Sequence, residues 1–265
     1  MTTVVLGGTG KTGRRLVRAL GDAPVRAVSR STEVRFDWSV RETWDAALAG
    51  ASSVYLVAPE DAGLAAPFVK QATAAGVGRF VVLSGRGIEQ VRNAFHGMAA
   101  AEAAARESGV EWTILRANNF NQNFDEDLWH APLLGGRLAL PMGAVPEPFV
   151  DVRDIAEVAA VVLTTDGHHG RTYDLSGPRG LTFAEAVATI AAAAKRKIRY
   201  EEVTPSEYRA MLLAEGLPEE VADELNEMFA AMRAGHLAEP ADGVRQVLGR
   251  APIDFADYAS AAWSA

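Results

Sequence analysis

The feature that most constrains this chain is a glycine-rich stretch near its start, VVLGGTGKTG, which follows a short β-branched run. Its Gly-Lys-Thr end is typical of loops that bind nucleoside triphosphates, but that motif requires a glycine where this chain has Val5. The glycines instead have a G-x-x-G-x-x-G spacing between a predicted strand and a predicted helix. We expect Gly7 to make the tight turn, Gly10 to let a diphosphate approach the backbone, and Gly13 to let the helix pack on the strand.

Beyond this loop, strand-like and helix-like segments alternate, which is typical of a parallel sheet with helices on both faces. The pattern predicts an α/β fold, a Rossmann-type doubly wound parallel sheet with a smaller, mostly helical C-terminal substrate lobe. Strands are predicted at 2–6, 24–28, 35–38, 53–58, 79–84 and 111–115, and helices at 11–20, 40–50, 61–75 and about 92–107.

One connection is too short for the regular scheme. Residues 29–34 separate two predicted strands, whereas a helical crossover between parallel strands needs roughly 10–12 residues. We therefore expect the second helix to be missing or reduced to a loop. The predicted domains are 1–150, with 151–177 returning to it, and a substrate-binding lobe at 178–265.

The composition excludes several classes of protein. A net charge of -8 argues against binding to nucleic acid, which requires a basic face. The chain has no cysteine, so it has no disulfide and no thiolate metal ligand. No apolar run approaches the ~18 residues of a membrane span, and the start lacks the pattern of a secretory signal. We predict a cytoplasmic monomer or homodimer whose partner is a small-molecule substrate, not nucleic acid or a membrane.

The end of the second strand bears on the cofactor. Enzymes that bind NAD usually have Asp or Glu there, whereas those that bind NADP use a positive side chain and small hydroxyl groups. This chain has Ser29, Arg30 and Ser31, with no carboxylate at the strand end, although Glu33 is close. Because the planar arginine side chain suits a phosphate, NADP(H) is favoured. The alternative is that Arg30 is an ordinary surface arginine.

Further cofactor contacts are expected where the carboxyl ends of the strands meet the glycine loop. Asp37 and Trp38 would lie beside the adenine, although Trp38 could equally be a packing aromatic. The ends of the strands at 53–58 and 79–84 would lie beside the ribose and nicotinamide. The predicted cofactor-binding residues are Gly7, Thr9, Gly10, Lys11, Thr12, Gly13, Ser29, Arg30, Ser31, Asp37, Trp38, Ala58, Pro59, Ser84 and Gly85.

Stretches along nearly the whole chain carry a family resemblance: GGTGKTG, SRS, RFDW, VYLVAPE, SGVEWTILRANNFNQNF, FVDVRDIAEVAAVVL, YDLSGPRGLTFAEAV and PIDFADYASAAW. Together they resemble the NmrA-like atypical short-chain dehydrogenases/reductases. The glycine loop, the FDW sequence and the missing helix are similar to the ergot-alkaloid branch, which includes festuclavine synthase and agroclavine dehydrogenase, and to its bacterial relatives. This resemblance implies reduction of imine or iminium bonds. The group also contains quinone reductases, isoflavone-reductase-like enzymes and redox-sensing regulators without catalysis.

A pair of residues typical of short-chain carbonyl reductases is missing. In those enzymes a tyrosine protonates the nascent alkoxide, and a lysine four residues later lowers its pKa. None of the five tyrosines in this chain is followed by such a lysine. An iminium ion needs no acid, because hydride addition gives a neutral amine directly. Quinone reduction is the next choice, since solvent can protonate a hydroquinone anion. His96 is a candidate catalytic acid, with a structural or solvated histidine as the alternative.

The substrate site is expected beyond the strand at 111–115 and under the C-terminal helices. The sequence NNFNQNF offers amides that could orient the substrate and phenylalanines that could wall it, with a polar turn and buried aromatics as the alternative. A methionine-containing helix that begins at Pro218 would form core or, alternatively, a flexible lid. The predicted substrate-binding residues are Phe95, Met98, Asn118, Asn119, Phe120, Asn123 and Phe124.

Other candidate chemistry is weak. His168 and His169 are adjacent but have no third ligand nearby, so no metal is predicted. Asp151 and Asp154 are expected as a helix N-cap and a first-turn acid, not a catalytic dyad. The sequence therefore predicts an NADPH-dependent oxidoreductase that delivers hydride to an imine or iminium. A quinone or azo reductase and a non-catalytic NADP(H)-sensing regulator of the NmrA type remain as alternatives.

Overall fold

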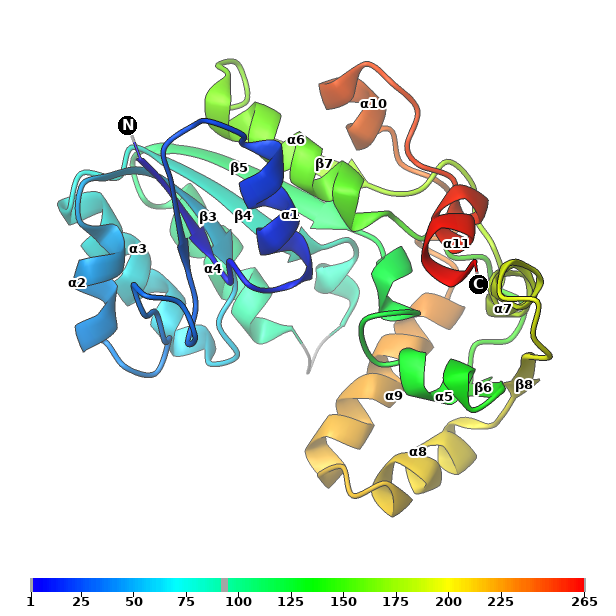
Figure 1. Ribbon diagram of the computed structural model, residues 1–265. Coiled ribbons are helices and arrows are strands. Elements are labelled where there is room, and N and C mark those ends of the chain that lie inside the picture. The colour runs from blue at the N-terminus through cyan, green and yellow to red at the C-terminus, as the bar shows by residue number, and fades with distance from the viewer. Residues whose placement is uncertain (1, 92–94, 265) are drawn as a thin grey trace.

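The computed structural model describes residues 2–91 and 95–264. Within them, a six-stranded parallel sheet has the order β2-β1-β3-β4-β5-β7, and a mostly helical lobe lies beside it (Figure 1). This arrangement confirms the predicted doubly wound α/β fold. The strands are β1 (Thr2–Leu6), β2 (Val25–Val28), β3 (Ala51–Val57), β4 (Arg79–Gly85), β5 (Glu111–Ala117) and β7 (Arg171–Leu175).

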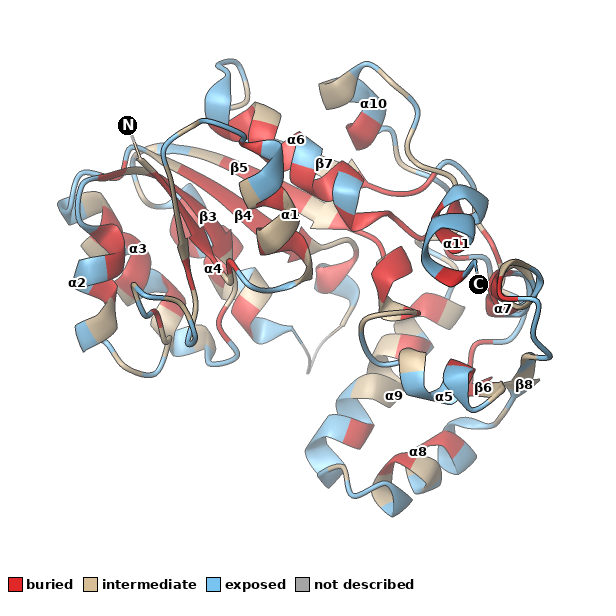
Figure 2. Ribbon diagram, viewed as in Figure 1, coloured by how far each residue is buried: buried red, intermediate tan, exposed pale blue. Residues whose placement is uncertain are grey.

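Helices cover both faces of this sheet because its strands are apolar on both sides. In β3, Val54 and Leu56 pack into one core and Tyr55 into the core on the opposite face. Figure 2 shows the strands as a buried layer between the helices. The first face is covered by α2 (Glu42–Leu48), α3 (Ala65–Ala74) and α4 (His96–Arg106), and the second by α1 (Lys11–Ala19), α6 (Val152–Thr164) and α10 (Gly243–Leu248).

Residues 29–34 contain no helix, as their number predicted, but the connection from β2 to β3 is not free of helix, because α2 lies between these two strands. The strand expected at 35–38 was wrong, because only an isolated parallel bridge joins Ser29 to Arg35. The physical reason is aromatic packing: the ring of Phe36 lies 5.5 Å from that of Phe68, and the ring of Trp38 lies 4.8 Å from the same ring. These contacts draw the chain into the core under α2 and α3, away from the path of a strand.

The C-terminal lobe has a core of its own, formed largely by aromatic side chains. The ring of Phe124 lies 4.7 Å from that of Trp129, and the ring of Trp129 lies 4.9 Å from that of Phe183. The elements of the lobe are α5 (His130–Leu134), α7 (Phe183–Ala193), α8 (Pro205–Ala214), α9 (Glu219–Arg233), α11 (Phe255–Trp263) and a two-stranded parallel sheet of β6 (Arg137–Leu140) and β8 (Arg199–Glu202).

The chain passes more than once between the two halves. Side chains from 124–149, between β5 and α6, pack in the lobe core with Phe183 and Phe255. In the opposite sense, α10 leaves the lobe and packs against α6 and β7. The prediction placed 1–150 in the first domain and 178–265 in the lobe, whereas this packing joins 124–149 to the lobe and α10 to the sheet.

Local capping explains where several helices begin. Asp151 accepts the N–H of Arg153 at 2.8 Å and is the N-cap of α6, and Asp154 lies in the first turn, as predicted. Thr182 and Thr204 form capping boxes at the starts of α7 and α8. Across the described ranges, the helices are too short or too polar to cross a membrane. The same ranges contain no cluster of three or more side chains that could hold a metal ion.

Candidate functional site: a dinucleotide crevice and the adjoining substrate lobe

The glycine loop joins β1 to α1. Gly7 has φ 65°, in the left-handed region that glycine adopts without strain, and its carbonyl accepts the N–H of Gly10 at 2.8 Å. At Gly13, a Cβ atom would lie 2.2 Å from the Gly7 carbonyl oxygen, so no side chain fits there. Gly8, which the sequence analysis did not single out, is equally crowded, because its Cβ would lie 2.7 Å from that of Ala27. The loop therefore brings the start of α1 close to β1 and β2.

The first turn of α1 is open to an anion. Gly10 is its N-cap without a side-chain cap, and no acidic residue lies in the first turn. The N–H groups there lack partners within the helix and carry the positive end of its dipole. Thr9 and Gly10 are exposed, whereas Thr12 is buried. The turn follows β1, whose neighbours β2 and β3 lie on opposite sides of it, at the switch point where dinucleotides bind. This geometry fits a diphosphate.

A cationic side chain without a partner lies at the end of β2. Arg30 is exposed and forms no hydrogen bond or ion pair with any part of the chain that the structure describes. Its neighbours Ser29 and Ser31 have hydroxyl oxygens 3.2 Å apart. Arg35, which the sequence analysis missed, lies opposite Ser29 through the isolated bridge and forms an ion pair with Asp37 at 3.1 Å. A free guanidinium beside two hydroxyls is the chemistry that a phosphate monoester requires.

Asp37 and Trp38 organise the turn that leads to α2. The Asp37 carboxylate accepts the Ser39 hydroxyl at 2.8 Å and the Ser39 N–H at 3.1 Å, and these bonds lower the pKa of Asp37. The Asp37 carbonyl accepts the indole N–H of Trp44 at 3.2 Å. Trp38 packs edge-on against Trp44 and Phe68, so it contributes to the core in this structure.

At the end of β4, polar side chains are already paired with one another. Ser84 is buried and donates its hydroxyl to Glu102 on α4 at 2.7 Å. Arg116 on β5 holds the same carboxylate with two bonds, of 2.9 and 2.8 Å. Burial alone would raise the pKa of Glu102, but the bonds from Arg116, Ser84 and Arg106 lower it below its usual value. Glu102 therefore stays ionised, and the Ser84 hydroxyl is committed to it.

The other predicted residues near these strand ends differ in exposure. Pro59, after β3, is buried and Ala58 is partly buried. Gly85 lies against Met98, since a Cβ on Gly85 would be 3.5 Å from the Met98 sulfur. At the start of α4, His96 and Phe95 are exposed, and Phe95 has a left-handed φ of 60°. Thus Gly85 and Met98 meet, whereas His96 faces solvent.

Beyond β5, two asparagines meet a buried carboxyl group that the sequence analysis missed. One carboxylate oxygen of Glu147 accepts the Asn118 side-chain N–H at 2.8 Å and the Asn119 backbone N–H at 3.1 Å. Burial raises the pKa of Glu147, and the asparagine donors act against this rise. Glu147 lies 28 or 29 residues from its partners in the chain, so no local pattern identified it. The only signal was an acid within an otherwise apolar stretch, PEPFV.

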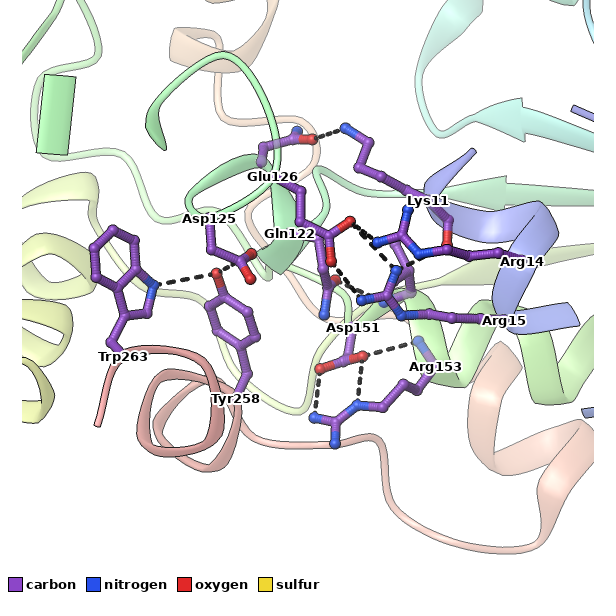
Figure 3. Close-up of polar contacts among 12 residues, drawn as sticks. Lys11, Arg14, Arg15, Gln122, Asp125, Glu126, Asp151, Arg153, Tyr258 and Trp263 are labelled. Atoms are coloured by element: carbon purple, nitrogen blue, oxygen red, sulfur yellow. Dashed lines mark hydrogen bonds and ion pairs between the residues drawn. The ribbon is translucent and has the colours of Figure 1, made fainter. Parts of the chain in front are cut away.

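The remaining part of this loop is tied to α1 by charge. Figure 3 shows the guanidinium groups of Arg14 and Arg15 converging on Glu126, with a distance of 2.6 Å for Arg15. Lys11 donates to Asn123 at 2.7 Å and also pairs with Asp127. The two halves of the molecule are therefore linked beside the glycine loop. Lys11 and Asn123, predicted to bind different ligands, here bind each other.

The two phenylalanines of this loop have different surroundings. Phe120 is partly exposed, and its ring centroid lies 5.6 Å from the Lys11 ammonium group. Phe124 is completely buried in the aromatic core of the lobe, against Trp129 and Phe149. Phe120 therefore lies beside the start of α1, whereas Phe124 has no exposed surface to offer a substrate in this structure.

Two cavities lie away from these residues. One, of about 530 Å³, is bordered by Arg106, Trp112 and His169 at the opposite ends of β4 and β5, and the other, of about 310 Å³, by Asp125, His130 and Trp263 in the lobe. Neither is lined by a residue predicted for the site. The carboxyl ends of the strands, and not these cavities, bring the predicted residues together.

Comparison with known proteins gives the relationship directly. The chain is 32% identical over 279 residues to the NAD(P)H azoreductase of Xenophilus azovorans, covering 97% of this chain and 96% of the relative. It is 30% identical over 290 residues to the agroclavine dehydrogenase of Claviceps fusiformis, covering 98% and 96%. Its fold is similar to that of Citrobacter sp. triphenylmethane reductase complexed with NADP(H), with a TM-score of 0.81, 22% identity, and coverage of 99% and 100%. The family model described as the NmrA-like family matches residues 1–254, and the chain belongs to that family.

Proposed function

We propose that this protein is an NADPH-dependent reductase of imine or iminium bonds. The observation that carries the cofactor assignment is the unpartnered Arg30 beside Ser29 and Ser31, at the edge of a glycine loop that is open to a diphosphate. NADP(H) itself is bound by the similar Citrobacter reductase. In this chain Arg30 would hold the 2′-phosphate, and the N–H groups at the start of α1 would hold the diphosphate.

The proposed reaction class follows from the side chains near the end of β4, where a proton donor would be expected. When bound, NADPH would supply a hydride: the electron pair of the hydride would form the new C–H bond, and the π pair of the C=N⁺ group would become the lone pair of a neutral amine. An iminium ion therefore needs no proton, whereas a neutral imine must take one up from solvent. This suits a site in which Ser84 donates to an ionised Glu102 and the chain has no Tyr-x-x-x-Lys sequence. The task left to the protein is to position the reactants and exclude water.

A relative favours a second candidate. The azoreductase from Xenophilus azovorans is 32% identical to this chain, so reduction of azo dyes or quinones is the alternative reaction. Both reactions use the same cofactor crevice and differ in the need for protons, because an azo or quinone group takes up protons as well as hydride. The third candidate, a regulator that senses NADP(H), uses the crevice without turnover.

One assay separates these candidates. Oxidation of NADPH is followed with three acceptors: N-methyl-3,4-dihydroisoquinolinium, 1,4-naphthoquinone and an azo dye. We expect the highest kcat/KM with the isoquinolinium. A higher value for either other acceptor would overturn the iminium assignment in favour of the second candidate. Absence of turnover with all three, together with tight and unequal binding of NADPH and NADP⁺, would identify a regulator.

A further inference from the structure

Glu147 is a buried acid whose backbone is fixed at the junction of the two halves. It lies between β6 and α6, and its N–H and carbonyl pair with Leu181 at 2.8 and 3.0 Å. The residue is 2% exposed, so its side chain does not face solvent. It turns instead toward the residues that follow β5, where it accepts from Asn118 and Asn119.

The two asparagines that it holds are not equivalent. Asn118 is buried and uses both ends of its amide, because its Nδ2 donates to Glu147 at 2.8 Å and its Oδ1 accepts from Arg86 at 3.1 Å. Asn119 is partly exposed, and its Nδ2 lies 3.4 Å from Glu147 and 3.5 Å from the Met232 sulfur. Its Oδ1 accepts no hydrogen bond from any residue within the described ranges. Asn119 therefore has an acceptor left over and no free donor.

This acceptor lies at the carboxyl end of the sheet. Ala117, two residues before Asn119, is paired with Gly85 at the end of β4, and Gly85 lies against Met98. On the other side of Asn119 is Met232 of α9. Asn119 thus lies between the strand ends and the lobe, in the region where a ligand lies in open parallel sheets.

The carboxyl group behind Asn119 fixes which end of the amide faces outward. An amide whose N–H groups are turned toward a carboxylate presents the negative end of its dipole away from it. The positive charge of Arg86 acts on Glu147, but Arg86 is also paired with Asp174 at 3.6 Å, so its charge is shared. A cationic group is attracted to such a surface, whereas the carbonyl oxygens of a neutral quinone are repelled by another acceptor.

We propose, on the basis of the proposed function, that Glu147 is a positioning residue that makes the site selective for cationic substrates. It holds Asn119 with its amide oxygen toward the reacting group, and the pair of Glu147 and Asn119 favours an iminium ion over a neutral acceptor of the same size. Glu147 itself touches neither substrate nor cofactor.

The test compares two bicyclic acceptors of similar size, cationic N-methyl-3,4-dihydroisoquinolinium and neutral 1,4-naphthoquinone. Glu147→Gln keeps the size of the side chain but lets Asn119 reverse its amide. We expect the ratio of kcat/KM for the cation to that for the quinone to fall on the order of tenfold, mainly through KM for the cation. Asn119→Leu, which removes the acceptor at similar volume, should lower the ratio as much, and the double variant should lower it no further.

Asp154→Asn is the matched control, because Asp154 is also a buried carboxyl group whose pKa is raised by burial. Asp154 lies in the first turn of α6 and accepts the N–H of Ile253, so it has no contact with Asn119. Asp154→Asn should leave the ratio unchanged. Equal losses for both acceptors in Glu147→Gln, or no loss for either, would overturn the proposal, because a purely structural role predicts no discrimination by charge.

A binding measurement keeps this test separate from the proposed function. Calorimetry with the NADP⁺-loaded protein gives the affinity for each acceptor without turnover. Tighter binding of the isoquinolinium in the natural protein, lost in Glu147→Gln, supports the role of Glu147 even if no acceptor is reduced. Equal binding of the isoquinolinium by both proteins would refute it, even if the natural protein reduces iminium ions.

Discussion

The edge of the sheet at β1 and β2 and the junction beyond β4 and β5 both lie at the carboxyl ends of the strands, but they are built in opposite ways. At the first, the backbone determines the shape, and Arg30 and the N–H groups of α1 are left without partners. At the second, the polar side chains are buried in bonded pairs, Ser84 with Glu102 and Asn118 with Glu147. A cofactor can be bound by polar groups that have no partner before it binds. Discrimination among substrates requires side chains whose positions are already fixed by hydrogen bonds within the protein.

The largest effect is expected from a substitution that disrupts the backbone of the glycine loop in the first region. In Gly13→Val, the new side chain would overlap the Gly7 carbonyl, so we expect a loss of about 3 kcal/mol in the free energy of unfolding and no measurable NADPH binding. Chemical denaturation and fluorescence titration measure the two quantities. Gly78→Ala is the control, because a Cβ there meets nothing closer than 4.0 Å. Normal NADPH binding by Gly13→Val would contradict the assigned role of the loop.

The second prediction concerns Arg30, the unpartnered cation at the end of β2. Arg30→Ala should weaken binding of NADPH by about 10- to 100-fold, because a charge-assisted contact with the 2′-phosphate is lost. Binding of NADH should not change. Arg18→Ala removes an exposed arginine from α1 and should affect neither cofactor. Equal losses for NADPH and NADH in Arg30→Ala would refute the phosphate assignment.

The third prediction concerns the pH dependence of stability, because two buried acids of the second region, Glu102 and Glu147, have pKa values shifted in opposite directions. The pKa of Glu102 is lowered from 4.5 by Arg116, so the unfolded chain binds more protons as the pH falls below 4.5, and stability is lost there. The pKa of Glu147 is raised from 4.5 by burial, so the folded protein binds more protons just above 4.5, and stability falls as the pH rises through its folded pKa.

Glu102→Gln and Glu147→Gln should therefore change opposite sides of the curve of unfolding free energy against pH. Glu102→Gln removes its part of the acid-side loss and costs about 2 kcal/mol near neutral pH, because an ion pair of low exposure is broken. Glu147→Gln removes its part of the loss above pH 4.5. Urea unfolding at a series of pH values measures both. Changes on the same limb would show that the two acids are not in opposite environments.

The smallest effect concerns the charged link between α1 and the loop beyond β5. Glu126→Gln should reduce the free energy of unfolding by about 1 kcal/mol at low salt, and by less at high salt, because Glu126 faces both Arg14 and Arg15 and its partners are partly exposed. Asp127→Asn, at a more exposed position, should have no measurable effect. Salt-independent loss in Glu126→Gln would show that packing, not charge, is responsible.

The strands of the sheet and the glycine turn could be predicted because each depends on residues that are close in the chain. The absence of a strand at 35–38 could not be predicted, since Phe36 and Trp38 pack against Phe68, which is distant in the chain. The family resemblance reached the same fold, but it did not indicate which side chains pair across the site.

The substrate side was harder to predict for the same reason. Lys11 reads as a cofactor residue until its pairing with Asp127, more than a hundred residues away, is seen. Glu147 has no sequence signature, because its role depends on two asparagines on a different element. Phe124 reads as part of a binding loop, although the aromatic packing of the lobe buries it completely.

The route of the chain between its two cores limits how such a protein can be recombined. A graft of the last third alone would lack Phe124, Trp129 and Phe149, which complete the core of the transplanted lobe. It would also replace the host's own α10, which packs against α6 and β7. A chimera with a new specificity must exchange residues 118–150 together with the lobe helices and keep the native α10.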